Sequence, residues 1–436
     1  MKFAFVTLGC KVNLCETQGL QQLAIERGHE IVESDAQAVV VNTCAVTAVS
    51  EHKNIRALHK VRKEHPLAVI ALIGCMAQIN ADKLRLDGTA QLIFGVQDRA
   101  AVLDACEKAV LGRCDTANIK MKKTVGHEFE ELPAGIPSGR TRALLKVEDG
   151  CNNFCSYCII PYARGRVRSL DPEKAVQEAK RLTAEGVNEI VVTGIEISSY
   201  GFDFPTDYGL IDLIECLCTA CPETRFRLGS LEPRTITPEF CKRLSVFPNL
   251  ARHFHLSLQS GCDTVLGRMN RKYTTDLFRK VVHMLRMAFT DCSITTDIIV
   301  GFPGETQIEF RETCDFVREI AFADVHVFPY SIRTGTKAAQ MVGQIDETEK
   351  RARANQLREI TGMTSENFRR GFIGKELSVI PEHMKRNGYW TAHSSYHFPV
   401  YISADERLRK NCPINVRIQE LFDDGVAAVI DCGING

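Results

Sequence analysis

Strand-like and helix-like patterns alternate along the first quarter of the chain. Short apolar runs predict strands at Phe3–Thr7, Ala38–Val41, Ala68–Ile73 and Leu92–Val96. Amphipathic stretches predict helices at Leu14–Arg27, Thr47–His65, Ala81–Leu86 and Arg99–Leu111. Because strands that alternate with crossover helices form parallel sheets covered on both faces, residues 1–112 are expected to be an α/β domain.

A second alternating array follows residues 113–140, whose basic cluster and subsequent Pro and Gly residues predict a linker. Apolar runs predict strands at Ala143–Val147, Glu189–Thr193, Arg225–Gly229, His253–Leu258, Ser293–Val300 and Val325–Pro329. Helical patterns follow at Pro172–Ala184, Thr274–Ala288 and Gln307–Ile320, among others. Six βα units predict a partial (β/α)6 barrel over residues 141–345, with functional residues at the C-terminal ends of its strands.

The pattern changes again near the C-terminus. A long charged helix is predicted at Glu347–Arg370, within a connecting segment at residues 346–371. Short alternating runs then predict strands at Leu377–Ile380, His397–Ile402, Ile414–Gln419 and Val426–Ile430. Residues 372–436 are therefore expected to be a small β domain.

Composition and charge narrow the class of protein. The 436 residues include 54 Lys and Arg and 54 Asp and Glu, which argues against a uniformly basic nucleic-acid binder but not against a local basic groove. No apolar run approaches the roughly 18 residues that a membrane-spanning helix needs, so no membrane partner is expected. The apolar run in MKFAFVTLGC is too short for a signal peptide, which predicts a cytoplasmic protein whose 18 cysteines are reduced.

Three cysteines form a compact motif directly after the first strand of the predicted barrel. Cys151, Cys155 and Cys158 have CxxxCxxC spacing, and thiolates are soft ligands that suit iron–sulfur clusters. Three ligands leave one iron of a [4Fe–4S] cluster open to chelate a small molecule. Zinc is the weaker alternative, because structural zinc sites use four ligands, typically in paired CxxC motifs. Incidental cysteines on a helix are the other alternative.

A second group of cysteines becomes visible only when the predicted strands are considered together. Cys10, Cys44 and Cys75 each follow a strand of the N-terminal parallel sheet, and the C-terminal ends of parallel strands meet at one edge. Cysteine is also a common buried residue, so ordinary packing is the alternative. Equivalent positions on three strands favour a second [4Fe–4S] cluster with an open iron.

With these motifs the chain resembles, from end to end, the radical S-adenosylmethionine (SAM) methylthiotransferases of the MiaB, RimO and MtaB group. The matching segments include TLGCKVNLCET, VVNTCAVT, GCMAQ, DGCNNFCSYCIIPYARGRVRS, TGIEISSYG, HLSLQSGCDTVLGRMNRKYT and TTDIIVGFPGET. The resemblance implies an N-terminal domain with an auxiliary cluster, a radical SAM barrel and a C-terminal TRAM domain. The C-terminal match is loose, in length and strand pattern only.

The resemblance also implies a SAM site at the ends of the barrel strands. Tyr157 would pack near the adenine, and residues after the second strand would contact the methionyl amine. Residues after the fourth strand could bind the ribose hydroxyls, and Arg268 could approach the carboxylate. The implied cofactor-binding residues are Tyr157, Thr193, Gly194, Glu196, Ser230, Glu232, Ser257, Gln259, Arg268 and Asp297, with Gly301–Glu305 beside them.

The segments GCKVN, EDGCNNFCSYCIIPYARG and FPYSIRTGTKAA are most similar to the MtaB type. That type implies methylthiolation of N6-threonylcarbamoyladenosine at position 37 of tRNA, with a one-electron reductant and a sulfur donor as further partners. The threonylcarbamoyl group carries a carboxylate, for which Lys11 or Arg164 is the expected cationic partner. Basic residues expected to approach RNA phosphates are Arg164, Arg166, Arg168, Arg268, Arg271, Lys272, Arg407, Arg409 and Lys410.

Four other functions stay open. Isopentenyladenosine in tRNA, or an aspartate of a ribosomal protein, could be the substrate of the same chemistry. A sulfur-inserting enzyme of the lipoyl synthase type would also carry an auxiliary cluster, but the N-terminal parallel sheet argues against it. A non-enzymatic RNA-binding module would need neither cluster.

Overall fold

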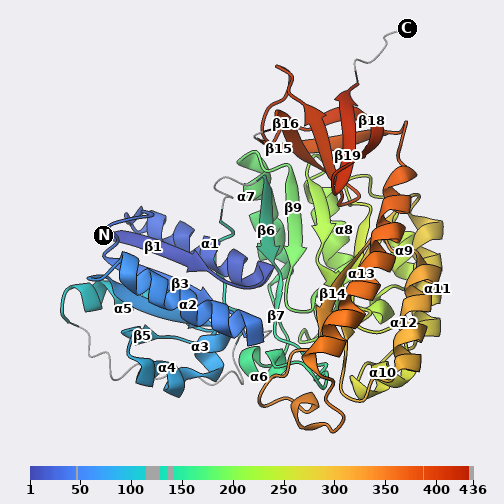
Figure 1. Ribbon diagram of the computed structural model, residues 1–436. Helices are drawn as coiled ribbons and strands as arrows, with labels where there is room; N and C mark the ends of the chain where they lie inside the picture. Colours follow the sequence, from blue (N-terminus) through green and yellow to red (C-terminus); the bar gives the residue numbers. More distant parts are fainter. Residues whose placement is uncertain (46–47, 114–127, 136–140, 386, 432–436) are drawn as a thin grey trace.

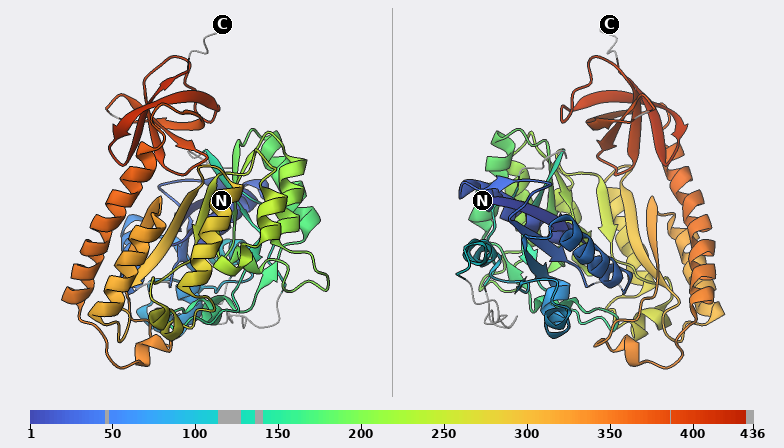
Figure 2. Two further views of the ribbon diagram at one scale, coloured as in Figure 1. Left: turned by 90° about the vertical axis from the view of Figure 1, so that its right-hand side faces the viewer. Right: turned by 60° about the vertical axis from the view of Figure 1, so that its left-hand side comes forward.

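The computed structural model describes residues 1–45, 48–113, 128–135, 141–385 and 387–431, in three parts that Figures 1 and 2 show from different sides. Most of the expected linker at 113–140 lies outside these residues, as do Cys114 and Cys432. Among the described helices, none combines the length and the apolar character that a membrane span requires.

The N-terminal part is a five-stranded parallel sheet in the order β2-β1-β3-β4-β5. Its strands are β1 (Lys2–Thr7), β2 (Glu30–Ile31), β3 (Ala38–Thr43), β4 (Val69–Gly74) and β5 (Leu92–Ile93). Its helices are α1 (Lys11–Glu26), α2 (Ala48–Glu64), α3 (Cys75–Ile79), α4 (Ala81–Asp87) and α5 (Arg99–Val110). Separate apolar clusters pack against its two faces, one around Val39 and Leu72 and the other around Val40 and Ile73. The predicted parallel sheet covered on both faces is confirmed.

One predicted strand of the N-terminal sheet is shorter than expected. β5 ends at Ile93 rather than at Val96, because the next residues turn toward the end of β4 and toward α3. The Val96 N–H donates to Gln78 Oε1 at 3.1 Å, and the Gly95 carbonyl accepts from the Gly74 N–H at 3.0 Å.

The central part is an open barrel of parallel strands. The strands are β6 (Arg142–Lys146), β9 (Glu189–Thr193), β10 (Arg225–Leu228), β11 (Ser230–Leu231), β12 (His253–Leu256), β13 (Ser293–Val300) and β14 (Asp324–Pro329). They pair in the orders β6-β9-β10 and β11-β12-β13-β14. Only Gly229 separates β10 from β11, so the two short strands occupy one position of the barrel. The six strand positions confirm the predicted partial (β/α)6 barrel.

Helices cover the outer face of this barrel. They are α7 (Pro172–Ala184), α8 (Leu210–Ala220), α9 (Pro238–Leu244), α11 (Thr275–Ala288), α12 (Gln307–Ile320) and α13 (Glu347–Arg370), the last of which runs along the outside in Figure 2. Short elements lie near the strand ends: β7 (Glu148–Asp149), α6 (Ile160–Arg164), β8 (Arg168–Ser169), η2 (Ile197–Ser199), η3 (Pro233–Thr235), α10 (Asp263–Arg268) and η4 (Ala338–Gln340).

The two faces of the barrel strands differ in polarity. Outward residues such as Ile190 and Phe226 enter the main apolar core beneath the helices. Because neighbours in a strand point to opposite faces, the residues next to them, Glu189 and Arg227, point inward and pair with each other at 2.7 Å. The lumen is consequently lined largely by polar and charged side chains.

The C-terminal part is a closed barrel in the order β15-β16-β17-β19-β18. Its strands are β15 (Glu376–Met384), β16 (Tyr389–Ser394), β17 (Pro399–Ser403), β18 (Ile414–Phe422) and β19 (Gly425–Ile430). It lies over the N-terminal ends of the central strands, at the end opposite α6 in Figure 1. Arg227 Nη2 donates to the Ser394 carbonyl at 2.8 Å, and the rings of His253 and His397 stack 4.2 Å apart.

Candidate functional site

The three N-terminal cysteines lie at one edge of the first sheet. Cys44 and Cys75 directly follow β3 and β4, and Cys10 is close behind the end of β1, on three adjacent strands. Gly9 adopts φ +110°, and a Cβ there would lie 2.4 Å from the Cβ of Cys44. Gly9 therefore lets the loop that carries Cys10 approach Cys44 more closely than any other residue could.

The surroundings of these thiols suit a metal cluster. Burial, with smaller contributions from the nearby Cys10 and Cys44, raises the pKa of Cys75 to about 11. Three thiolates in this space would repel one another unless bound cations compensate their charge, and thiolate sulfur is the ligand that iron–sulfur clusters use. Arg164 opposes the repulsion, because its Nε donates to Cys75 Sγ at 3.3 Å.

The barrel cysteines occupy the loop between β7 and α6, beyond the C-terminal end of β6. Burial raises the pKa of both Cys151 and Cys158 to about 12, and the neighbouring cysteines contribute to both shifts. The backbone N–H of Asn153 donates to Cys151 Sγ at 3.4 Å, and Arg271 Nη1 donates to Cys155 Sγ at 3.2 Å. The loop thus gathers three thiols and supplies donors to two of their sulfurs.

The two groups of cysteines face each other across the junction of the N-terminal and central parts. The pKa of Cys158 is raised mainly by burial and in part by Cys75 of the other group. Helix α6, which begins soon after Cys158, packs against α3, which begins with Cys75 (Figure 1). Arg164, at the end of α6, makes the direct contact with Cys75.

A buried network of charges joins the same two parts. Arg164 is completely buried and donates to Glu16 of α1 at 2.7 Å and to Asp149 of β7 at 2.9 Å. Lys146 also bonds both carboxylates, at 2.8 Å each, and Arg99 of α5 reaches Glu16 at 2.9 Å. Sequence analysis missed this network, because isolated charged residues far apart in the chain look like surface residues.

The network corrects two expectations for Arg164 and Arg168. Arg164 has no exposed surface and is paired with carboxylates, so it is neither a phosphate contact nor a partner for a substrate carboxylate. Arg168 is also buried and pairs with Asp149 at 3.3 Å. Of the three arginines Arg164, Arg166 and Arg168, only Arg166 is exposed. Arg271 contacts Cys155 instead of facing solvent as an RNA contact would.

A carboxylate beside the barrel cysteines has one buried oxygen with no hydrogen-bond donor among the described residues. Glu196 follows β9, and burial raises its pKa to about 7. Its Oε2 accepts from Asn153 of the cysteine loop at 3.4 Å, whereas its Oε1 accepts no hydrogen bond from any described residue. A Cβ on Gly194 would lie 2.7 Å from Glu148 Oε2, so that position requires glycine. An unsatisfied acceptor of this kind fits the ammonium group of SAM.

The other expected SAM contacts lie mostly along the same rim. Tyr157 packs edge-to-face on Phe302, with ring centroids 6.5 Å apart. The Ser257 carbonyl accepts from Arg271 Nη2 at 3.0 Å, and the Gln259 N–H donates to the Asp297 carbonyl at 2.9 Å. The remaining positions are at strand ends: Thr193 ends β9, Ser230 begins β11, and Glu232 follows β11.

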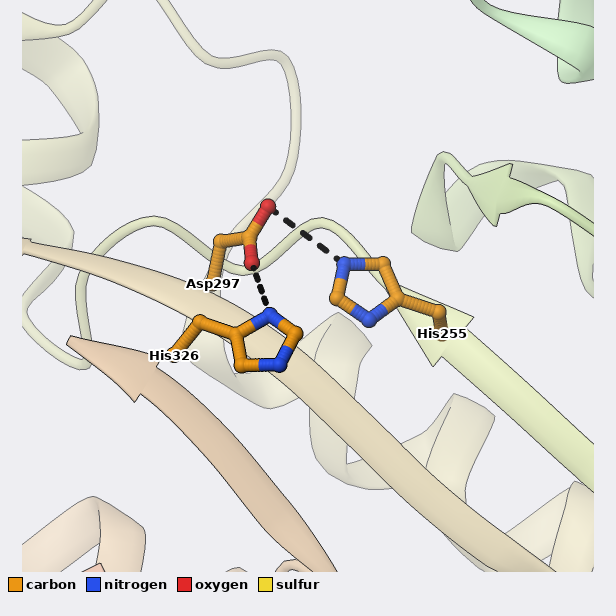
Figure 3. A group of neighbouring side chains, drawn as sticks. All are labelled: His255, Asp297 and His326. Carbon is orange, nitrogen blue, oxygen red and sulfur yellow. Dashed lines mark hydrogen bonds and ion pairs between the residues drawn. The ribbon is translucent and has the colours of Figure 1, made fainter. Parts of the chain in front are cut away.

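Two of the expected contacts lie apart from the open rim. The guanidinium of Arg268 pairs with Glu309 at 2.8 Å. Asp297 lies between His255 and His326 and pairs with both, as Figure 3 shows. The roles assigned to all of these SAM-contact residues stay predictions.

Comparison with protein families identifies two regions. The radical SAM superfamily matches residues 145–317, and the family described as "Uncharacterized protein family UPF0004" matches residues 2–95. These regions contain the barrel cysteines and the N-terminal cysteines, respectively.

Curated relatives match along most of the chain. Threonylcarbamoyladenosine tRNA methylthiotransferase MtaB of Bacillus subtilis is 39% identical over 384 residues, which cover 87% of this chain and 84% of the relative. MtaB of Aquifex aeolicus is 35% identical and covers 89% and 97%. The tRNA-2-methylthio-N(6)-dimethylallyladenosine synthase of Moorella thermoacetica is 33% identical and covers 87% of each chain.

Solved structures share the fold at low sequence identity. The radical SAM methyltransferase TsrM from Kitasatospora setae, solved with cobalamin and a [4Fe-4S] cluster, has a TM-score of 0.55 at 14% identity and covers 78% of this chain and 77% of TsrM. The cobalamin-dependent SAM radical enzyme OxsB has a TM-score of 0.52 at 12% identity and covers 83% of this chain and 56% of OxsB.

Proposed function

This chain belongs to the MtaB group of radical SAM methylthiotransferases, and on that premise we propose that it adds a methylthio group to C2 of N6-threonylcarbamoyladenosine at position 37 of tRNA. The product is the 2-methylthio derivative of that nucleoside. The observation that carries the proposal is the 39% and 35% identity to two MtaB enzymes over most of the chain.

Membership of the radical SAM superfamily brings SAM and one [4Fe–4S] cluster. We assign that cluster to Cys151, Cys155 and Cys158, and a second [4Fe–4S] cluster to Cys10, Cys44 and Cys75. When bound, these groups supply an electron that cleaves SAM to a 5′-deoxyadenosyl radical and a site for the sulfur that is transferred. A one-electron reductant and a sulfur donor are therefore further partners of the reaction.

The chain's own residues orient SAM, stabilise the cysteine thiolates and shield the reaction from water. The free Oε1 of Glu196 would accept a hydrogen bond from the methionyl amine and would orient SAM beside the cysteine loop. Arg271 and Arg164 each donate to one cysteine sulfur, which stabilises the negative charge of ligated thiolates. Most of the cysteines are buried, which limits access of water to a reactive radical.

The substrate is tested with two tRNAs that differ only at the modified adenosine. Reconstituted enzyme, SAM, reductant and sulfide are supplied with tRNA that carries either the threonylcarbamoyl or the isopentenyl group. Mass spectrometry of the nucleosides should detect the 2-methylthio product from the threonylcarbamoyl tRNA. Product from the isopentenyl tRNA alone would assign the chain the activity that its 33% identical Moorella relative is named for.

The second cluster is tested through iron content and SAM cleavage. The reconstituted protein should hold about eight iron atoms, as two [4Fe–4S] clusters require. Replacing Cys10, Cys44 and Cys75 together by Ala should remove about half of the iron and abolish methylthiolation, while 5′-deoxyadenosine still forms. The matching change of Cys151, Cys155 and Cys158 should also remove about half of the iron, but it should stop 5′-deoxyadenosine formation. Unchanged iron in the first variant would make its cysteines packing residues.

A further inference from the structure

The lumen of the barrel contains a cluster of titratable side chains that the proposed reaction has not yet used. His255, Asp297 and His326 project inward from the neighbouring strands β12, β13 and β14 (Figure 3). His326 Nδ1 lies 3.1 Å from one carboxylate oxygen of Asp297, and His255 Nε2 lies 3.4 Å from the other. His255 is also fixed from its other side, because its Nδ1 lies 2.9 Å from Thr295 Oγ1.

A lysine of the N-terminal part enters the same space. Lys11 is the first residue of α1, directly after Cys10, and its ammonium group interacts electrostatically with Asp297 and Glu189 and with Arg142 and Arg227 of the barrel wall. The group can still reach water, but the surrounding walls remove part of its hydration. Lys11 forms no hydrogen bond or ion pair with any described residue.

Unlike Lys11, the arginines nearby have hydrogen-bond or ion-pair partners. Arg227 is paired with Glu189 at 2.7 Å and with two carbonyls of the C-terminal barrel. Arg164 is paired with Glu16 and Asp149. Arg142 Nη2 contacts His393 at 3.2 Å. Lys11 is therefore the partly desolvated cation for which the described lumen offers no direct partner, and such a cation favours an anionic ligand.

His326 can supply a second donor to the same ligand. About half of its side chain is exposed, so the ring is accessible from the lumen. Its Nδ1 is occupied by Asp297, whose hydrogen bond raises the pKa of His326 and favours the ring with both N–H groups. Its Nε2 lies 3.6 Å from Asp324 Oδ2, a separation too long for a hydrogen bond.

We propose that Lys11 and His326 bind the carboxylate of the threonylcarbamoyl group, and that His255 and Asp297 orient His326 for this contact. The proposal rests on the proposed function, because it names the site that recognises the substrate's N6 substituent. Lys11 adjoins the cluster ligand Cys10, so a nucleoside held there lies beside the sulfur-bearing site. An isopentenyl group carries no charge and would leave the Lys11 ammonium desolvated and unpaired.

A metal ion is the competing occupant of the three wall residues. Their ligand atoms lie within 4.8 Å of one another, which is compatible with a bound cation. However, each oxygen of Asp297 already faces a histidine nitrogen, so the group is satisfied as an ion-pair cluster without a metal. Carboxylate recognition also accounts for Lys11, whose positive charge would disfavour a nearby cation.

The test uses three anticodon stem–loop RNAs that differ only in the N6 substituent: threonylcarbamoyl, its methyl ester and isopentenyl. KM and kcat for methylthiolation are measured with the reconstituted enzyme, together with iron content and metal analysis. We expect KM for the ester to exceed that for the acid by about 10- to 100-fold, as expected when a charge-assisted contact is lost.

Variants then assign the preference to the named side chains. Lys11→Met and His326→Phe should raise KM for the acid and remove most of the difference in KM between acid and ester. Lys11→Arg keeps the positive charge and should keep most of that difference. His283→Phe, on the exposed face of α11, is the matched control and should keep the wild-type preference. Because Lys11 adjoins a cluster ligand, His326→Phe provides an independent measurement if Lys11→Met loses iron.

The possible outcomes separate this inference from the proposed function. Methylthiolation of acid and ester with equal KM, or an undiminished preference in His326→Phe, would overturn the inference and leave the proposed function standing. Activity on the isopentenyl RNA alone would overturn the proposed function itself. Stoichiometric zinc or manganese that is retained by wild type and lost from His326→Phe would make the wall residues a metal site and overturn the inference.

Discussion

At the scale of single residues, close backbone approach shapes the N-terminal cysteine site. A Cβ on Gly9 would lie 2.4 Å from Cys44 Cβ and 2.9 Å from Cys44 Sγ, and the φ of +110° disfavours any side chain. A change at Gly9 therefore displaces two cysteines at once, even though glycine offers no ligand atom.

Replacing Gly9 by Ala should consequently disrupt the N-terminal cluster while the barrel cluster survives. We expect loss of up to about half of the iron and at least about a 10-fold loss of methylthiolation, with 5′-deoxyadenosine formation retained. The control is Gly28→Ala, since Gly28 also has a positive φ, +79°, but has open space around its Cβ position. Equal iron contents in the two variants would contradict the role given to Gly9.

At the scale of elements, the longer helices and strands could be predicted from sequence because local signals agreed with tertiary packing. Helix α12 begins with a capping box between Thr306 and Glu309, and α13 begins with Asp346 accepting from two backbone N–H groups. The elements missed include β2, α3 and β16, together with the short elements β7, β8, α6 and α10 near the strand ends of the barrel. β2 and α3 are too short to show periodicity, and β16 (YWTAHS) does not alternate apolar and polar residues regularly.

The candidate site could be predicted only in part, for a related reason. The positions of the cysteines follow from the strands that precede them, since parallel strands end at one edge. The partners of Cys75 and Cys155, Arg164 and Arg271, could not be derived, because a sequence does not reveal which charged residues are buried by contacts between distant segments. The expected domain boundaries, near residues 112, 141, 345 and 372, stay predictions.

A prediction for the barrel wall follows from the contact of β10 with β9 and β16. Arg227 pairs with the fully buried Glu189 and donates to the carbonyls of Ser394 and Ser395. Replacing Arg227 by Met would leave the Glu189 carboxylate buried with much less compensation. We expect the free energy of unfolding to fall by about 3–5 kcal/mol, measured by urea denaturation.

A second variant separates loss of charge from loss of packing at the same place. Arg227→Met combined with Glu189→Gln removes both charges, so it should recover a large part of the stability. Recovery would show that the unpaired carboxylate causes the loss. If the double variant were as unstable as Arg227→Met alone, the contacts with the C-terminal barrel would be the dominant contribution.

At the scale of the whole molecule, buried charges connect the N-terminal part to the barrel. Burial alone would raise the pKa of Glu16, but Arg164, Arg99 and Lys146 outweigh it and lower the pKa to about 2. Because this folded-state pKa lies below the ordinary value of 4.5, the carboxylate stabilises the structure fully above about pH 4.5. That stabilisation is lost as the pH falls from there toward about 2.

Acid should therefore weaken the connection between the two parts. Thermal unfolding of the apoprotein, followed by calorimetry between pH 7 and pH 3, should show a midpoint that falls below about pH 4.5, because Glu16 then takes up a proton in the unfolded chain but stays ionised in the folded one. The full effect of this group is on the order of 3 kcal/mol. Glu16→Gln should begin from a lower midpoint at pH 7 and depend less steeply on pH. An identical pH dependence in both proteins would exclude Glu16 as the acid-sensitive group.

The contact of Arg164 with Cys75 also has a kinetic consequence. Arg164 ends the short helix that begins just after Cys158, and its buried pairing with Glu16 and Asp149 holds the two cysteine groups next to each other. SAM cleavage at one group and methylthio transfer from the other would then act on a nucleoside that stays in one place. The cleavage products of one SAM molecule have to leave before the next SAM enters, and we expect their release to limit turnover.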